Sequence, residues 1–65
     1  MQVLKDEIRH KILLEAELLF LQKGYDRTTL QMIADKVNIS KSNFYHYFRS
    51  KEEMFYVLTD GAADG

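Results

Sequence analysis

The sequence predicts an all-α fold. Apolar residues recur three and four positions apart through most of the chain, which is the spacing of one helix face. No run of β-branched residues alternates with polar ones between turn residues, as a strand would require. Proline is absent, and serines, threonines and Gly24 stand where helices are expected to begin and end. With 65 residues the chain holds one domain at most, and a domain this small buries only about 60% of the surface that its unfolded chain exposes.

The first predicted helix runs from about Lys5 to Lys23. Gly24 follows it directly, as glycine commonly does at a helix end, and Tyr25 is placed to fold back on the last turn. The main apolar stripe of this helix consists of Ile8, Ile12, Ala16, Leu19 and Phe20. A second stripe, here called the leucine stripe, lies on a roughly opposite face and consists of Leu14, Leu18 and Leu21. A helix with two apolar faces needs two partners, so we expect the partner of the leucine stripe to lie outside this chain.

The second predicted helix begins at a capping box. The side chain of Thr28 is expected to cap the amide of Gln31, and Gln31 to reach back to Thr28. Asn38 is expected to end the helix, because asparagine readily adopts the left-handed conformation found after many helices. The apolar positions between these ends are Leu30, Ile33, Ala34 and Val37.

Ser40 is predicted to cap a third helix, which runs from about Lys41 to Phe48 and turns Phe44 and Phe48 toward the core. Two short helices joined by about four residues form a helix-turn-helix. In this motif the leading residues of the second helix enter the major groove of DNA, so they must form hydrogen bonds and must not be bulky. The residues at this position are Lys41, Ser42 and Asn43.

A fourth helix is predicted to begin at Ser50, with Glu53 at the reciprocal position of a capping box, and to continue to about Thr59. Its inward-facing residues are Met54, Val57 and Leu58. The expected fold is therefore a three-helix, homeodomain-like helix-turn-helix bundle followed by the start of a fourth helix, all within residues 1–60. Residues 61–65 carry no core-forming side chain and are expected to fray.

Charge is unevenly distributed, although the net charge is only −1. Residues 27–51 carry five basic side chains and one acidic side chain, whereas residues 52–65 carry four acidic ones and no basic one. A phosphate responds to local charge, so the basic middle favours nucleic acid. A solvated charged face would produce the same pattern.

The composition argues against several other classes of protein. Cysteine is absent, which excludes disulfides and thiolate metal sites and fits a reducing compartment such as the cytoplasm. Two histidines and no glycine-rich phosphate loop argue against an enzyme, and we expect neither a cofactor nor a metal. The apolar segment 12–21 is too short to cross a bilayer, and the N-terminus does not have the pattern of a signal peptide.

The segment TTLQMIADKVNISKSNFYHYFRSKEEMF resembles the signature of the TetR family of transcriptional repressors, roughly TT…IA…GVSKGTLYxHFxSKEEL. The preceding LLFLQKGYDRTT resembles the LF…KGY…TT of the same family. The resemblance covers about Ile12 to Leu58, and the ordered combination of these motifs is far more specific than a bare helix-turn-helix. It implies sequence-specific DNA binding by the DNA-binding domain of a ligand-responsive repressor.

The resemblance implies that bases are faced by the start of the second helix and the start of the third. Gln31 would pair with an adenine edge, unless it only closes the capping box. Lys41 would meet guanine or a phosphate, and Asn43 would meet adenine. Ser42 would face a base as well, unless it is merely a residue of the first helical turn.

The resemblance also implies phosphate contacts. The Tyr45 hydroxyl would bond a phosphate oxygen, unless its ring is half-buried in the core. Lys51 would hold a phosphate together with the amides at the start of the fourth helix, and Thr29 would do so from the second. His46 would face solvent or phosphate, and Arg49 would either reach the DNA backbone or stay solvated.

Three positions depart from the family pattern. Phe44 stands where members usually have leucine, and Asn38 where many have glycine. Tyr47 stands where members usually have histidine, so a phosphate contact there would come from a phenol instead of an imidazole.

Family members dimerise through a second helical domain that also binds a small inducer, and we expect these 65 residues to hold the DNA-binding domain without it. The resemblance thus implies a homodimer on a pseudo-palindromic operator for a full-length protein, and a monomer for these 65 residues. An alternative of a different class is a short helical interaction module that binds another helical regulator through the leucine stripe.

Overall fold

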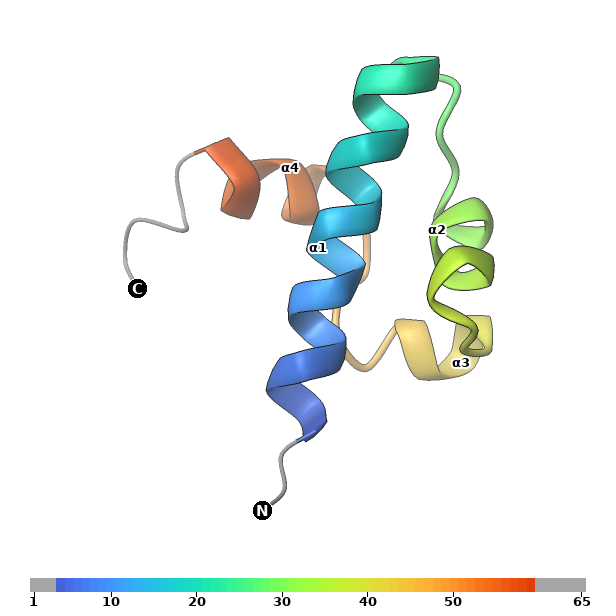
Figure 1. Ribbon diagram of the computed structural model, residues 1–65, viewed down its shortest axis with the longest axis vertical. Helices are drawn as coiled ribbons and strands as arrows, with labels where there is room; N and C mark the ends of the chain where they lie inside the picture. The colour runs from blue at the N-terminus through green and yellow to red at the C-terminus, as the bar shows by residue number, and fades with distance from the viewer. Residues whose placement is uncertain (1–3, 60–65) are drawn as a thin grey trace.

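The computed structural model describes residues 4–59, and its side chains from Glu7 onward (Figure 1). Four helices follow one another: α1 (Leu4–Lys23), α2 (Leu30–Val37), α3 (Lys41–Phe44) and α4 (Lys51–Thr59). The described residues contain no strand, which confirms the predicted all-α class. Helix α1 packs against both α2 and α4, and α2 packs against α3. The predicted fraying of residues 61–65 and the domain end at residue 60 lie outside the described residues.

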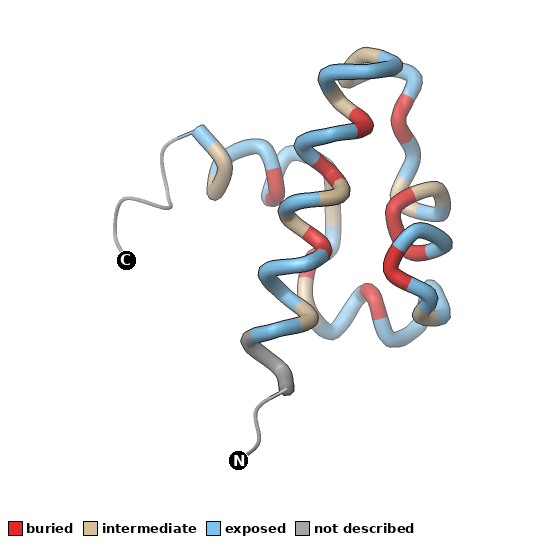
Figure 2. Tube along the Cα trace, viewed as in Figure 1, coloured by how far each residue is buried: buried red, intermediate tan, exposed pale blue. Residues whose placement is uncertain are grey.

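The core lies where α1 faces the helix-turn-helix, and every helix contributes to it (Figure 2). Two rings, those of Phe44 and Phe48, are its largest members, and their centroids are 6.5 Å apart. The predicted apolar positions are confirmed, because the buried hydrophobic residues are Ile12, Ala16, Leu19, Ile33, Ala34, Val37, Phe44, Phe48 and Met54. The other predicted core positions pack against this cluster while remaining partly exposed, and they are Ile8, Phe20, Leu30, Val57 and Leu58.

Helix α1 ends as its sequence predicts. Gly24 has φ +97°, in the left-handed region, and its amide donates to the carbonyl of Phe20 at 2.9 Å. The ring of Tyr25 then folds back on the last turn, with its centroid 5.1 Å from that of Phe20. The glycine and the aromatic pair together turn the chain toward α2.

The start of α2 lies one residue later than predicted. Thr29, and not Thr28, is the N-cap: its backbone is extended and its side chain accepts a hydrogen bond from the amide of Met32 at 3.1 Å. Thr28 is fully buried, and its hydroxyl donates to the carbonyl of Gly24 at 2.9 Å. Gln31 donates to the Asp35 carboxylate instead of reaching back to Thr28. Either threonine can cap a helix, and the need to satisfy Gly24 next to the core selects Thr28 for the inward position.

Helix α3 is shorter than predicted. The α-helix ends at Phe44 and not near Phe48, and the next three residues form a turn. The amides of His46 and Tyr47 donate to carbonyls three residues back, at 3.0 and 2.8 Å, which is the tighter 3₁₀ pattern. Phe48 remains in the core beyond this turn, with its amide bonded to the Phe44 carbonyl at 3.1 Å, so the tighter turn ends the α-helix without exposing the second phenylalanine.

The capping box of α4 is present. The Ser50 hydroxyl accepts from the amide of Glu53 at 3.2 Å, and the Glu53 carboxylate accepts from the amide of Arg49 at 2.8 Å. The reciprocal bond therefore ends one residue before the cap and fixes the chain as it enters α4.

The leucine stripe is exposed, as its sequence predicts: Leu14, Leu18 and Leu21 retain 48%, 50% and 77% of their accessible surface. Beside it, α1 and α4 enclose an open groove of about 240 Å³, lined by His10, Leu13, Leu14, Glu17, Val57 and Leu58. Within residues 4–59, no helix has the length and apolar character needed to cross a membrane.

Two leucines on the same helix provide a direct test of this core. Leu19 is 3% exposed and Leu21 is 77% exposed. Leu19→Ala is expected to lower the free energy of unfolding by about 2–5 kcal/mol, because it leaves a cavity. Leu21→Ala should change it by less than about 0.5 kcal/mol. Urea titration followed by circular dichroism measures both, and similar midpoints for the two variants would contradict this arrangement.

Candidate nucleic-acid interface

The turn between α2 and α3 is fixed by its backbone. Asn38 lies in the left-handed region, with φ 64° and ψ 43°, as its sequence predicts. Its amide donates to the carbonyls of Ala34 and Asp35, and the amide of Ile39 donates to Ala34 at 3.1 Å. This pattern is a Schellman motif, and Ile39 packs against the core as the motif favours. The direction of α3 relative to α2 is thereby set by local hydrogen bonds.

The leading end of α3 faces solvent. Ser40 caps it, since its hydroxyl accepts from the amide of Asn43 at 3.1 Å. Phe44 anchors the opposite side of the helix in the core. The three residues predicted to face bases at this end are all exposed: Lys41, Ser42 and Asn43. The ammonium of Lys41 lies 5.9 Å from the centroid of the Tyr45 ring, within cation–π range.

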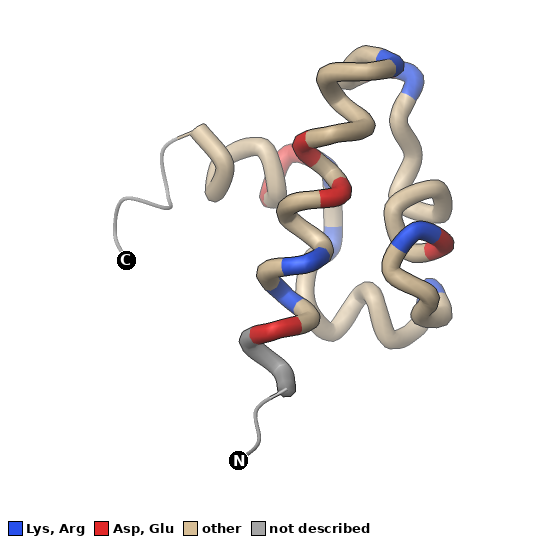
Figure 3. The backbone as a smooth tube through the Cα atoms, viewed as in Figure 1, with Lys and Arg blue, Asp and Glu red and all other residues tan. Residues whose placement is uncertain are grey.

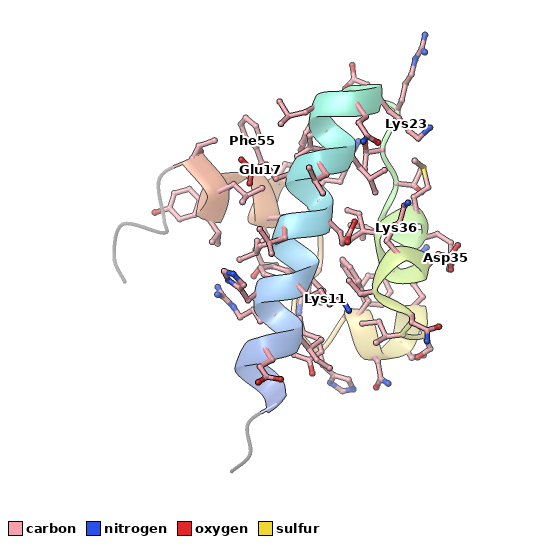
Figure 4. All side chains as sticks on the ribbon, viewed as in Figure 1. Lys11, Glu17, Lys23, Asp35, Lys36 and Phe55 are labelled. Atoms are coloured by element: carbon pink, nitrogen blue, oxygen red, sulfur yellow. The ribbon has the colours of Figure 1, made fainter. Side chains whose placement is uncertain are left out.

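The predicted contacts at the start of α2 lie on its exposed surface. Thr29 is exposed, although its hydroxyl oxygen is already the cap acceptor for α2. Gln31 is exposed too, and its side-chain nitrogen donates to the Asp35 carboxylate at 2.9 Å. Asp35 projects from α2 away from α1 (Figure 4). The hydrogen bond to Asp35 uses one N–H of the Gln31 amide, which has a second N–H and an acceptor oxygen with which to meet an adenine edge.

The aromatic residues after α3 divide into two kinds. Tyr45 is 45% exposed and His46 is exposed, so both are accessible at the outer surface. Tyr47 is partly buried and packs against the core, so only part of its side chain is free for a ligand. Of the two tyrosines, Tyr47 is the one that packs against the core cluster.

Lys51 is placed differently from the other predicted contacts. It is partly buried, and its ammonium donates to the carbonyl of Tyr25 at 2.6 Å and lies 4.4 Å from the centroid of the Tyr25 ring. Partial burial raises the pKa of the Tyr25 hydroxyl above its ordinary value, and the charges of Glu52 and Asp26 raise it further. The ring is therefore a neutral phenol at neutral pH. Sequence reasoning missed this contact, because no local pattern links two residues 26 positions apart.

The helix-turn-helix carries two lysines, Lys36 and Lys41, and one acidic residue, Asp35, whereas α4 carries only acidic charge after Lys51 (Figure 3). Phe55 of α4 lies on the opposite side of α1 from Asp35 and Lys36 of α2 (Figure 4).

In the part of the chain that the structure describes, no three acidic or histidine side chains are grouped as a metal site would need.

A capped α3 with an exposed polar leading end, braced by α2 across a Schellman turn, defines a helix-turn-helix domain of the kind found in DNA-binding regulators. Residues 12–57 match the profile of bacterial regulatory proteins of the tetR family. The chain belongs to this family, which is one of transcriptional regulators and not a class of enzymes.

Regulators from staphylococci are among the curated relatives that the chain matches. The chain is 44% identical over 48 residues to the biofilm operon icaADBC HTH-type negative transcriptional regulator IcaR of Staphylococcus epidermidis. The aligned residues make up 74% of this chain and 26% of that protein. The chain is 46% identical over 48 residues, with the same coverage, to IcaR of Staphylococcus aureus strains Newman and COL. The match thus spans about a quarter of the length of these relatives. No solved structure gives a significant match.

The left-handed residue of the turn can be tested with two substitutions. Asn38→Ala is expected to lower the free energy of unfolding by about 1 kcal/mol, because alanine disfavours positive φ. Asn38→Gly should be neutral or slightly stabilising, since glycine adopts this conformation without steric cost. Thermal unfolding of both variants measures the difference, and equal effects would mean that the backbone at residue 38 does not have positive φ.

Proposed function

We propose that this chain is the DNA-binding domain of a transcriptional repressor and binds an operator in a sequence-specific way. The observation that carries the proposal is the exposed polar end of α3, formed by Lys41, Ser42 and Asn43 above the buried Phe44. The major groove is wide enough for a helix, and these side chains supply donors and an acceptor at its leading end. The IcaR relatives are negative transcriptional regulators, which supports repression over activation.

In this proposal each exposed group has a role at the DNA. Lys41 donates to guanine or a phosphate, Asn43 pairs with adenine, and Ser42 contacts a neighbouring base. Gln31 contributes from the start of α2 through its amide oxygen and the N–H that Asp35 does not bond. The phosphates are held by Thr29, Tyr45 and His46 and by the hydroxyl of Tyr47. Lys51 is the other predicted phosphate contact, but in the free protein its ammonium is bonded to the Tyr25 carbonyl, which points to a different role for it.

We further propose that the whole protein is longer than the domain and acts in the cytoplasm as a homodimer without catalytic activity. A second helical domain would dimerise, bind a small inducer and cover the leucine stripe and its adjoining groove. The exposure of Leu14, Leu18 and Leu21 supports such a covering partner. Two domains would then meet a pseudo-palindromic operator with half-sites about 34 Å apart, while the 65-residue chain alone would be monomeric.

Salt dependence tests DNA binding directly. Fluorescence anisotropy should show that the chain binds a random duplex weakly and a duplex selected from a random pool more tightly. Both affinities should fall steeply with salt, with a log–log slope of about −0.9 for each phosphate neutralised. No affinity for either duplex, together with salt-insensitive capture of another helical regulator through the leucine stripe, would contradict this function and favour an interaction module.

The base-facing residues are tested by repeating the selection with variants. Asn43→Ala and Lys41→Ala are expected to change the selected bases, because a good side-chain pair discriminates by about 1–3 kcal/mol. Lys23→Ala is the matched control, since Lys23 is an exposed lysine at the far end of α1. It should leave the selected sequence unchanged. If all three variants select the wild-type sequence, the assignment of α3 to the bases is wrong.

A further inference from the structure

One carbonyl group joins two distant parts of the domain. The backbone carbonyl oxygen of Tyr25 accepts a hydrogen bond from the Lys51 ammonium at 2.6 Å and another from the Thr28 amide at 3.3 Å. Lys51 is the first residue of α4, and Thr28 directly precedes the N-cap of α2. The side chain that begins α4 is therefore bonded to the same atom that closes the turn leading into α2.

The turn itself leaves little freedom to the start of α2. Thr28 is fully buried, and its hydroxyl is bonded to the Gly24 carbonyl. Thr29, the next residue, is the cap of α2 and a proposed phosphate contact. A shift of the Tyr25 carbonyl would move the Thr28 amide and hence the position of Thr29.

Aromatic packing also holds Tyr25 in place. The ring centroids of Phe20, Tyr25 and Phe55 lie 5.1 to 6.3 Å from one another, so α1, the turn and α4 meet in one cluster. The Lys51 ammonium lies 4.4 Å from the Tyr25 centroid and adds a cation–π contact to this cluster. The cation thus contacts both the ring and the carbonyl of one residue.

We propose that Lys51 is a positioning residue, which fixes the start of α2 for DNA binding by bonding the Tyr25 carbonyl. The proposal rests on the proposed function, and it deepens that function by linking the orientation of α4 to the placement of Thr29 and Gln31. A lysine whose main task is a phosphate would instead extend its ammonium into solvent in the free protein. The two roles differ in a measurable way, because only a phosphate contact contributes to the salt dependence of DNA affinity.

The first part of the test needs no DNA. The 65-residue chain, labelled with ¹³C and ¹⁵N, is compared with Lys51→Met, Lys51→Arg and the matched control Lys41→Met. Lys51→Met is expected to shift the Tyr25 carbonyl and the Thr29 amide, and to speed hydrogen exchange at the Thr28 amide roughly tenfold. Lys51→Arg keeps the charge and the donors and should retain most of the wild-type values. Lys41→Met should not move these signals.

The second part uses a duplex that the wild-type chain selects from a random pool. Lys51→Met is expected to bind it severalfold more weakly at every salt concentration, with an unchanged log–log slope, and Lys51→Arg should restore most of the affinity. A slope reduced by about 0.9 with unmoved Tyr25 and Thr28 signals would overturn the positioning role in favour of a phosphate contact. Unchanged affinity in Lys51→Met would overturn it as well.

Two remaining outcomes are separable. If the wild-type chain binds no duplex, the proposed function fails, whereas the carbonyl and exchange measurements still report whether Lys51 fixes the turn. If Lys51→Met does not fold, the wild-type Lys51 ammonium signal decides. We expect that signal to stay unshifted when the duplex is added, and a shift with coupling to a ³¹P nucleus would overturn the proposal.

Discussion

The DNA-facing arrangement depends on the burial of Phe44. Helix α3 has four residues, too few to be stable as an isolated helix in water. The fully buried ring of Phe44, packed near Phe48, holds one side of α3 in the core. The other side is thereby kept in solvent, where its polar residues are free to meet a ligand. Exposure of the leading end is thus a consequence of apolar burial behind it.

Local backbone chemistry then gives the short helix its direction. Asn38 supplies the left-handed residue that ends α2, and Ser40 caps α3 two residues later. The same combination occurs earlier, where Gly24 ends α1 and Thr29 caps α2. In each case a residue tolerant of positive φ is followed by a hydroxyl that satisfies the first free amides of the next helix. The hydrogen bond from the Lys51 ammonium to the Tyr25 carbonyl then connects α4 to the turn that precedes α2.

Much of the fold was predictable because it rests on local rules. The helical spacing of apolar residues identified the core positions, and the preferences of glycine and asparagine identified two helix ends. Two features of the fold were not predictable, and each depends on tertiary contacts. Both threonines of the TT pair can cap a helix, and only burial beside Gly24 decides between them. The early end of α3 is a tight turn that still places Phe48 in the core, and the spacing of apolar residues does not distinguish such a turn from a longer helix.

The candidate site divides in the same way. The exposure of Lys41, Ser42 and Asn43 follows from their position at a capped helix start, which the sequence reveals. The bond of Lys51 to a carbonyl 26 residues away has no local signature. The likeness to the tetR family located these residues without describing how each is held, and the structure supplies that description.

The central claim is that the leading end of α3 lies against base edges. The most direct measurement is a set of intermolecular nuclear Overhauser effects between the labelled chain and a selected duplex. If α3 lies in the major groove, contacts are expected from the side chains of Lys41 and Asn43 to major-groove protons of the bases. Contacts confined to Leu14, Leu18 and Leu21, or none from α3, would contradict it.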